Sequence, residues 1–110
     1  MKKTRFDIDW KRGETIKAEE IVFIEAQGKY TQVFSSRGSF FSDCMLAVWE
    51  KKLENDEFIR CHRGYLVNRR YIVRIHDKEI ELKNGARIRI SRRLRKETMK
   101  RYREYILNEA

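Results

Sequence analysis

One stretch of the chain decides its fold: Phe58-Ile59-Arg60-Cys61-His62-Arg63-Gly64-Tyr65-Leu66-Val67-Asn68-Arg69-Arg70-Tyr71-Ile72. Two apolar runs of β-forming residues flank a short basic break, which is typical of two strands joined by a turn. Five arginines and no carboxylate fall between Phe58 and Arg74. The charge of such a run must be compensated by water, by a distant carboxylate or by an external polyanion, and phosphate backbones are the commonest polyanions. The stretch therefore predicts a β structure that binds nucleic acid.

The positive charge gathers in the C-terminal half of the chain. The formal net charge is +9, from 26 lysines and arginines against 17 acids. Residues 58–74 contribute +5 and residues 83–103 contribute +9, so the rest of the chain sums to −5. A binding face requires this kind of segregation, whereas evenly spread charge would indicate only solubility.

Length and composition bound the class of protein. A chain of 110 residues that is 41% hydrophobic and 12% aromatic predicts a single domain, residues 1–110, rather than a disordered basic tail. No apolar run approaches the roughly 18 residues of a membrane span, and the N-terminus lacks the apolar region of a signal peptide. We therefore expect a cytoplasmic protein without membrane insertion. Cys44 and Cys61 fit reduced thiols and lack metal-ligand spacing, so no metal or other cofactor is expected.

The apolar pattern predicts mostly strands. They are expected at Phe6–Trp10, Thr15-Ile16, Ile21–Ile24 (a central strand), Tyr30–Phe34, Phe40-Phe41, Phe58–Cys61, Tyr65–Val67 and Tyr71–Ile75, with turns at Arg12-Gly13, Gln27–Lys29 and Arg37-Gly38. Asn84-Gly85, between Ile80/Leu82 and Ile88/Ile90, is the strongest hairpin signal.

Two segments change to a helical period. The first, Asp43–Leu53, is expected to begin at Asp43 as its N-cap and to bury Met45, Leu46, Trp49 and Leu53. The second, Leu94–Leu107, is expected to have Ser91 as its N-cap and one face formed by Leu94, Thr98, Tyr102 and Ile106. The chain therefore runs from strands to a helix, and again from strands to a helix.

Three motifs, in this order, resemble those of the LytTR family of bacterial DNA-binding domains. They are Ile24-Glu25-Ala26 followed by Gly28-Lys29-Tyr30, then Arg60-Cys61-His62-Arg63 with Val67-Asn68, and finally Ile90-Ser91-Arg92-Arg93. The resemblance covers residues 21–93, which is far more specific than a single short pattern. Gly64 departs from the family, where a small polar residue such as serine is expected; a glycine there can loosen the turn or remove one hydroxyl contact.

The resemblance implies both the fold and the function. The expected fold is mainly β, an elongated antiparallel β-sheet fold with one central and one C-terminal helix, whose loops enter successive major grooves. The expected function is sequence-specific binding of double-stranded DNA at repeated promoter elements in bacterial transcription regulation, without enzymatic activity. The chain would be the output domain of a two-component response regulator, with a receiver domain or a regulatory protein as partner, or a stand-alone regulator. We expect a monomer or weak dimer that pairs on DNA.

The base-reading positions of the family fall on three loops of this sequence. Carried over by motif, they are Lys29, Tyr30 and Thr31 in the first loop, Arg63 in the second, and Arg92 and Arg93 in the third. An arginine suits this role because its guanidinium can donate two parallel hydrogen bonds to guanine O6 and N7. Phosphate contacts are expected from other basic residues near these loops and on the last helix: Arg60, Arg69, Arg70, Arg95, Lys100 and Arg101.

Several groups have a simpler structural interpretation. His62 beside Cys61 is more often a hydrogen-bonding residue of a strand turn than a metal ligand or nucleophile, and Cys61 is expected to be a small buried hydrophobe. Asn68 is expected to cap a turn. Six aromatic residues are expected in the core, while Tyr30 fits core or surface: Phe23, Phe34, Phe40, Phe41, Trp49 and Phe58. The basic residues of the last helix can form a solvated face that adds only non-specific attraction.

Two other functions compete with DNA binding. An RNA-binding β module also joins strands, aromatic residues and basic charge, but it usually shows a solvent-facing aromatic pair, and Tyr30 is the one loop aromatic that fits. It is therefore the alternative. A small nuclease would need clustered carboxylates or a histidine with a carboxylate partner. The nearest approach is His76 with Asp77, which strand alternation would send to opposite faces, so the nuclease is excluded.

Overall fold

A computed structural model describes residues 5–7, 15–54 and 57–109. Part of the predicted first strand (residues 8–10) and the turn at Arg12-Gly13 lie outside the described residues. The strands are β1 Arg5–Asp7, β2 Thr15–Lys17, β3 Ile21–Gln27, β4 Tyr30–Ser35, β5 Gly38–Ser42, β6 Phe58–His62, β7 Tyr65–Asn68, β8 Ile72–His76, β9 Glu79–Leu82 and β10 Arg87–Arg89. The helices are α1 Leu46–Lys52 and α2 Arg95–Glu109, and short 3-10 turns lie at Ala18–Glu20 and Arg69–Tyr71.

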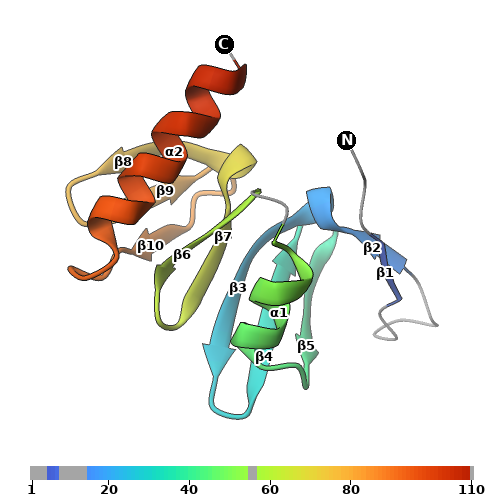
Figure 1. Ribbon diagram of the computed structural model, residues 1–110. Helices are drawn as coiled ribbons and strands as arrows, with labels where there is room; N and C mark the ends of the chain where they lie inside the picture. The colour runs from blue at the N-terminus through green and yellow to red at the C-terminus, as the bar shows by residue number, and fades with distance from the viewer. Residues whose placement is uncertain (1–4, 8–14, 55–56, 110) are drawn as a thin grey trace.

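The described strands form three sheets in which every pairing is antiparallel. The largest has the order β5-β4-β3-β7-β6, so the prediction of a central strand at residues 21–24 is confirmed. A second sheet has the order β10-β9-β8, and β1 pairs with β2 separately (Figure 1). The mainly antiparallel fold with a central and a C-terminal helix is confirmed, and its extents are 39 × 32 × 25 Å.

The five-stranded sheet packs buried side chains on both of its faces, which divides the core into two clusters. Helix α1 covers one face and packs Leu46, Trp49 and Leu53 against Ile24 and Val33. The three-stranded sheet covers the other face, where side chains of β3, β6 and β7 meet those of β8, β9 and β10. Burial of this kind contributes about 25 cal/mol for each Å² of apolar surface removed from water. The two packed layers therefore hold the loops between strands at fixed positions.

The first helix begins later than predicted. Met45 is its N-cap residue, without a side-chain hydrogen bond, so the prediction that Asp43 caps the helix is wrong. Residues 43–45 instead connect β5 to α1, and the carbonyl of Cys44 accepts a hydrogen bond from Thr31 Oγ1 at 2.9 Å. This bond ties the connection to the sheet, which delays the helix to Leu46. Met45, predicted to be buried, has 61% of its side chain exposed for the same reason.

The second helix begins at Arg95, so the prediction that Ser91 caps it is also wrong. The Ser91 hydroxyl accepts a hydrogen bond from the Leu94 N–H at 3.2 Å, which closes a turn before the helix. Thr98 is buried and Tyr102 packs on the second core cluster, as the predicted face requires. Ile106 is 45% exposed, because α2 extends beyond β6, the strand it packs against.

Two further expectations are corrected. Phe41 is 65% exposed rather than buried, because its neighbour Phe40 takes the core-facing position of β5. Asp77 lies in the two-residue turn between β8 and β9 with φ +55°, not in a strand. Strand alternation therefore does not separate His76 from Asp77, and both line one pocket. The argument against a nuclease from alternation is wrong, although no group of three or more metal-binding side chains occurs among the described residues.

Candidate nucleic-acid interface

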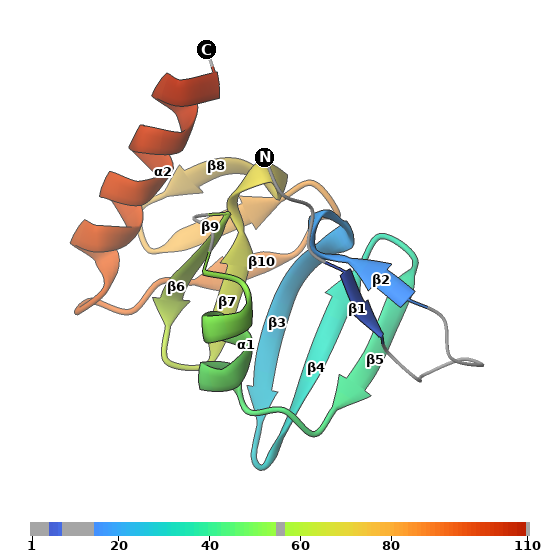
Figure 2. The ribbon, with the colours of Figure 1, turned by 45° about the vertical axis from the view of Figure 1, so that its right-hand side comes forward.

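Three loops lie along one edge of the domain. They are the segment between β10 and α2, the β6–β7 turn and the β3–β4 turn, which follow one another from the left side to the bottom of the domain in Figures 1 and 2. These are the loops in which the sequence motifs placed the base-reading residues. Antiparallel pairing produces this arrangement because β3 and β6 both end at this edge of their sheet.

The β6–β7 loop exposes the side chain of Arg63, and hydrogen bonds hold its backbone in place. Its neighbour Arg60 donates from Nη2 to the Arg63 carbonyl at 2.7 Å and from Nε to the His62 carbonyl at 3.1 Å. Arg60 Nη1 also forms an ion pair with Glu50 of α1 at 2.5 Å. One half-buried guanidinium therefore joins the helix to the backbone of the loop. Glu50 carried no signal in the sequence, because its role depends on where α1 packs.

His62 is a structural hydrogen-bonding residue, as predicted. Its Nδ1 accepts a hydrogen bond from the Gly64 N–H at 3.0 Å, and its ring packs edge-on against Tyr65 with centroids 5.4 Å apart. The Gly64 carbonyl accepts from the Ala26 N–H of β3 at 2.9 Å. The loop is thus closed by its own histidine and tied to the neighbouring strand.

The β10–α2 segment exposes Arg92 and Arg93 and is attached to the second loop. The Ser91 N–H donates to the Cys61 carbonyl at 2.9 Å, which joins the end of β10 to β6. Arg63 and Arg93 line one pocket of about 330 Å³, together with Arg60, Arg101 and two carboxylates, Glu50 and Glu97. The structure therefore brings together the two arginines that the motifs singled out from positions thirty residues apart.

The β3–β4 turn is less supported. Gly28 adopts φ +64°, which a two-residue hairpin turn accepts most readily from glycine, and Lys29 and Tyr30 are exposed. Thr31 is fully buried: its Oγ1 donates to the Cys44 carbonyl and accepts from Trp49 Nε1 at 3.1 Å. The prediction that Thr31 contacts DNA is therefore corrected, because its hydroxyl is used inside the protein to hold α1 on the sheet.

The six predicted phosphate contacts fall into two groups. Arg60 and Arg69 act inside the protein: Arg69 Nη1 donates to the Arg101 carbonyl at 3.1 Å, and its guanidinium lies 4.7 Å from the Tyr105 ring centroid. Arg69 thereby docks α2. The other four residues keep their basic groups at the surface or in a pocket. Arg70 and Lys100 are exposed, and Arg95 and Arg101 are half-buried. Asn68 caps the following turn as predicted, since its Oδ1 accepts from the Arg70 N–H at 3.0 Å.

The thiols are free, and Cys61 is the small buried hydrophobe that the sequence predicted. Burial raises the pKa of Cys61 to about 12, so its thiol stays protonated near neutral pH. Cys44 is half-buried in the connection before α1. In the part of the chain that the structure describes, no helix is long and apolar enough to cross a membrane.

Comparison with known proteins identifies the same family as the motifs. The family model of the LytTr DNA-binding domain matches residues 11–103. The solved structure of a LytTr DNA-binding domain from Bacillus cereus superimposes with a TM-score of 0.73 at 26% identity, over 83% of this chain and 90% of that one.

Two curated proteins are similar over part of their length. The sensory transduction protein LytT of Bacillus subtilis is 30% identical over 90 residues, which is 77% of this chain and 37% of LytT. The CO-responsive transcriptional regulator RcoM of Rhodospirillum rubrum is 35% identical over 54 residues, which is 49% of this chain and 23% of RcoM. The chain therefore corresponds to less than half of the length of either relative.

Proposed function

This chain belongs to the LytTR family of DNA-binding domains, and we propose that it binds duplex DNA sequence-specifically through the three loops of one edge. Arg63 and Arg93 carry the proposal, because both are exposed and both line the same pocket. Each guanidinium can donate two parallel hydrogen bonds to a guanine edge in the major groove. A loop held rigid before binding loses less conformational entropy when it engages a base.

The remaining basic residues serve different roles in this proposal. Arg92, beside Arg93, and Lys29 with Tyr30 on the first loop contact the same duplex at the ends of the edge. Arg70, Lys100 and Arg101 attract the phosphate backbone without reading sequence. Arg60 and Arg69 hold the reading loop and α2 rather than touch phosphate. Residues 1–110 act as one domain.

The names of the relatives support a wider role. LytT is named for sensory transduction and RcoM for transcriptional regulation. We extend this to the chain as a regulator of bacterial transcription in the cytoplasm, the output domain of a response regulator that receives its signal from a receiver domain or a regulatory protein. In this proposal each monomer contacts DNA through one edge of the domain, so two monomers can bind side by side on repeated promoter elements. The chemistry of the site requires neither a cofactor nor catalysis.

The experiment is selection of DNA from a random duplex library by the purified domain, followed by fluorescence anisotropy with the selected and a scrambled duplex. We expect the selected duplex to bind at least tenfold more tightly at physiological salt, as about 1–3 kcal/mol for each well-placed bidentate contact implies. Equal affinity for both duplexes would contradict the proposal.

RNA binding has one observation in its favour. Phe41 is opposite Gln32 in the β4–β5 register, so these two side chains share a sheet face. Tyr30 lies two residues before Gln32 on β4 and therefore points to the same face, which places both exposed aromatic side chains together. Exposed aromatic pairs stack the bases of single strands. Tighter binding of single-stranded RNA than of the selected duplex at matched salt, lost in Phe41→Ala, would support this alternative over DNA.

A further inference from the structure

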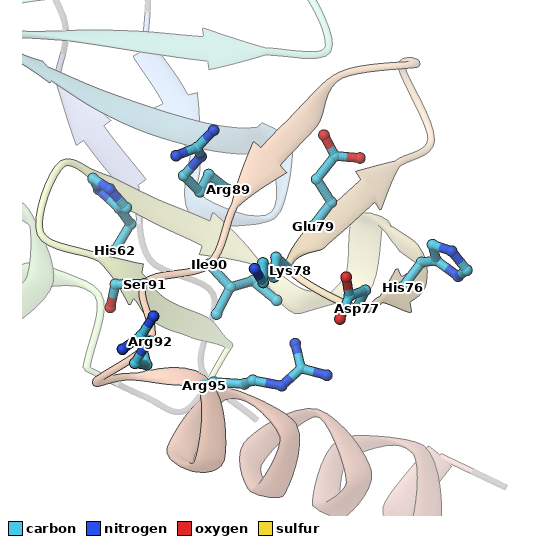
Figure 3. A pocket seen from close by; sticks show the side chains of 10 residues that line it. All are labelled: His62, His76, Asp77, Lys78, Glu79, Arg89, Ile90, Ser91, Arg92 and Arg95. Carbon is cyan, nitrogen blue, oxygen red and sulfur yellow. The ribbon is translucent and has the colours of Figure 1, made fainter.

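A second and larger pocket lies beside the third loop. Its volume is about 640 Å³, and it is formed by the β8–β9 turn, the end of β10 and the first turn of α2, with His62 at the side of the second loop. Figure 3 shows the side chains that line it, which come from segments far apart in the sequence. No base-reading motif was assigned to most of these residues, since Arg92 alone belongs to a predicted reading position.

The lining of this pocket is rich in positive charge. Four cationic side chains face two carboxylates: Lys78, Arg89, Arg92 and Arg95 against Asp77 and Glu79. Glu79 is already engaged, because its Oε1 accepts a hydrogen bond from Arg87 Nη1 at 3.3 Å. The pocket therefore favours an anion over a cation or a neutral group.

Arg95 is the most telling member of this lining. Its Nη1 is buried and has no hydrogen-bond partner among the described residues. Figure 3 shows its side chain extending from the start of α2 toward the β8–β9 turn and Asp77. A buried guanidinium nitrogen without an acceptor costs free energy, and a water molecule or a bound anion can supply that acceptor. A guanidinium fork matches the oxygens of a phosphate or a carboxylate.

His62 connects the pocket to the reading loop. Because its Nδ1 accepts the Gly64 N–H, the neutral ring carries its proton on Nε2, which makes that nitrogen a hydrogen-bond donor. The lining of the pocket thus includes guanidinium, ammonium and imidazole donors. Several donors of this kind around one space suit a compact anion with three or more acceptor oxygens better than a planar carboxylate.

We propose that this pocket binds a phosphate group, with Arg95 as its principal ligand and Lys78 and Arg89 as secondary ones. One source of the group is the backbone phosphate of duplex DNA beside the base read by the third loop, and this source rests on the proposed function. The other source is the phosphate of a free small molecule, which would occupy the pocket in competition with DNA. Both sources present the same oxygens to the same side chains.

The test uses two probes on the 110-residue chain. Inorganic phosphate is titrated into the protein while NMR records the amides of residues 76–79 and 89–95, with chloride at matched ionic strength as the control. The dissociation constant of the selected duplex is then measured across a salt series. The variants are Arg95→Gln and Lys78→Gln, and the matched control is Arg103→Gln, an exposed cation of α2 that does not line the pocket.

If a DNA phosphate is the occupant, Arg95→Gln makes the negative slope of log K against log salt shallower by about one unit. The preference for the selected over the scrambled duplex stays intact. If a free phosphate is the occupant, phosphate moves these amides in the unmodified protein, Arg95→Gln abolishes the shifts, and phosphate weakens DNA binding beyond the chloride control. Lys78→Gln, an exposed turn residue, gives a smaller change in the same direction and covers the case in which Arg95→Gln does not fold.

The proposal is overturned if neither pocket variant differs from Arg103→Gln in the salt series and phosphate moves no amide of the pocket. Its failure is separable from that of the proposed function. Equal affinity of the unmodified protein for the selected and the scrambled duplex would contradict sequence-specific reading. The phosphate titration contains no DNA, so its result does not depend on that outcome.

Discussion

The β6–β7 loop and the β3–β4 loop are both two-residue turns on the same edge, yet they are held very differently. The first, residues 62–65, is fixed by Arg60 on two of its carbonyls and by His62 on the Gly64 N–H. The second, residues 27–30, is closed by a turn with Gly28 at positive φ, and a side-chain hydrogen bond from Gln27 to Gln32 joins its two strands. We call them the pinned loop and the open hairpin.

The comparison shows how one edge can combine two kinds of contact. A side chain carried by a pinned loop reaches its partner with little loss of freedom, which favours discrimination between bases. A side chain on an open hairpin can adapt to different partners but gains less from any one of them. Arg63 is therefore expected to supply specificity, and Lys29 and Tyr30 to supply adaptable contacts.

The largest expected effect comes from removing the side chain that the pinned loop carries. Arg63→Ala is expected to weaken binding of the selected duplex by about 1–3 kcal/mol, because a bidentate contact to guanine is lost. Tyr30→Ala, on the open hairpin, is the matched comparison and is expected to cost less. Fluorescence anisotropy with both variants checks the order, and an equal or larger loss for Tyr30→Ala would remove the distinction between the loops.

The next effect comes from releasing the pin while Arg63 stays in place. Arg60→Ala removes two hydrogen bonds to the loop and is expected to reduce the preference for the selected duplex by about 1 kcal/mol. Glu50→Gln acts in the same direction more weakly, since it leaves those two bonds intact. Arg74→Ala, which breaks the ion pair with Glu81 at a distance of 3.1 Å, is the control. If Arg60→Ala keeps the full preference for the selected duplex, the hydrogen bonds from Arg60 to the loop do not contribute to base discrimination.

Labelling of the two thiols measures how firmly the pinned loop stays closed. Only a thiolate is alkylated rapidly, and a thiol whose pKa is raised to about 12 carries very little thiolate at pH 8. Cys61 is therefore expected to react much more slowly than Cys44, and its rate should rise with pH well beyond neutrality. Mass spectrometry after a timed alkylation gives both rates. Similar rates at pH 8 would show that β6 opens readily beneath the loop.

The smallest effect is expected from restoring the family's residue in the pinned loop. A Cβ added at Gly64 would lie 3.6 Å from His62 Nδ1, an ordinary contact, and no left-handed φ is required there. Gly64→Ser should therefore change stability and DNA affinity by less than about 0.5 kcal/mol. Thermal unfolding and anisotropy both report on it. A large gain in affinity would show that the serine hydroxyl makes a contact of its own.

The order of elements could be predicted from the sequence because it depends on local signals. Alternating apolar residues and the Asn84-Gly85 turn gave the strands, and the structure confirms the hairpin they join. The predicted starts of the two helices were wrong. Asp43 and Ser91 have side chains that commonly cap helices, but packing decides where each helix begins. Thr31 could not be placed either, since its burial depends on Trp49 and Cys44, which approach it only in the folded chain.

The candidate site was predictable where a motif marked an exposed arginine. Arg63 and Arg93 carried such marks, and the structure places them in one pocket. The roles of Arg60 and Arg69 were not predictable, because a guanidinium that supports the protein and one that contacts phosphate are identical in sequence. Arg92 and Arg95 of the second pocket were marked in the sequence as DNA contacts, but the pocket itself was not predictable, since its lining comes from three separate segments that meet only in the folded chain.

The most direct test of the account compares Arg63→Ala and Arg93→Ala with Lys100→Ala, an exposed cation of α2. The affinity of each variant for the selected and the scrambled duplex is measured across a salt series. We expect the two arginine variants to lose affinity mainly for the selected duplex, and Lys100→Ala to weaken both duplexes alike and to make the dependence of log K on log salt shallower by roughly one unit. This expectation would be contradicted if the arginine variants weakened both duplexes equally while Lys100→Ala eroded the preference for the selected one.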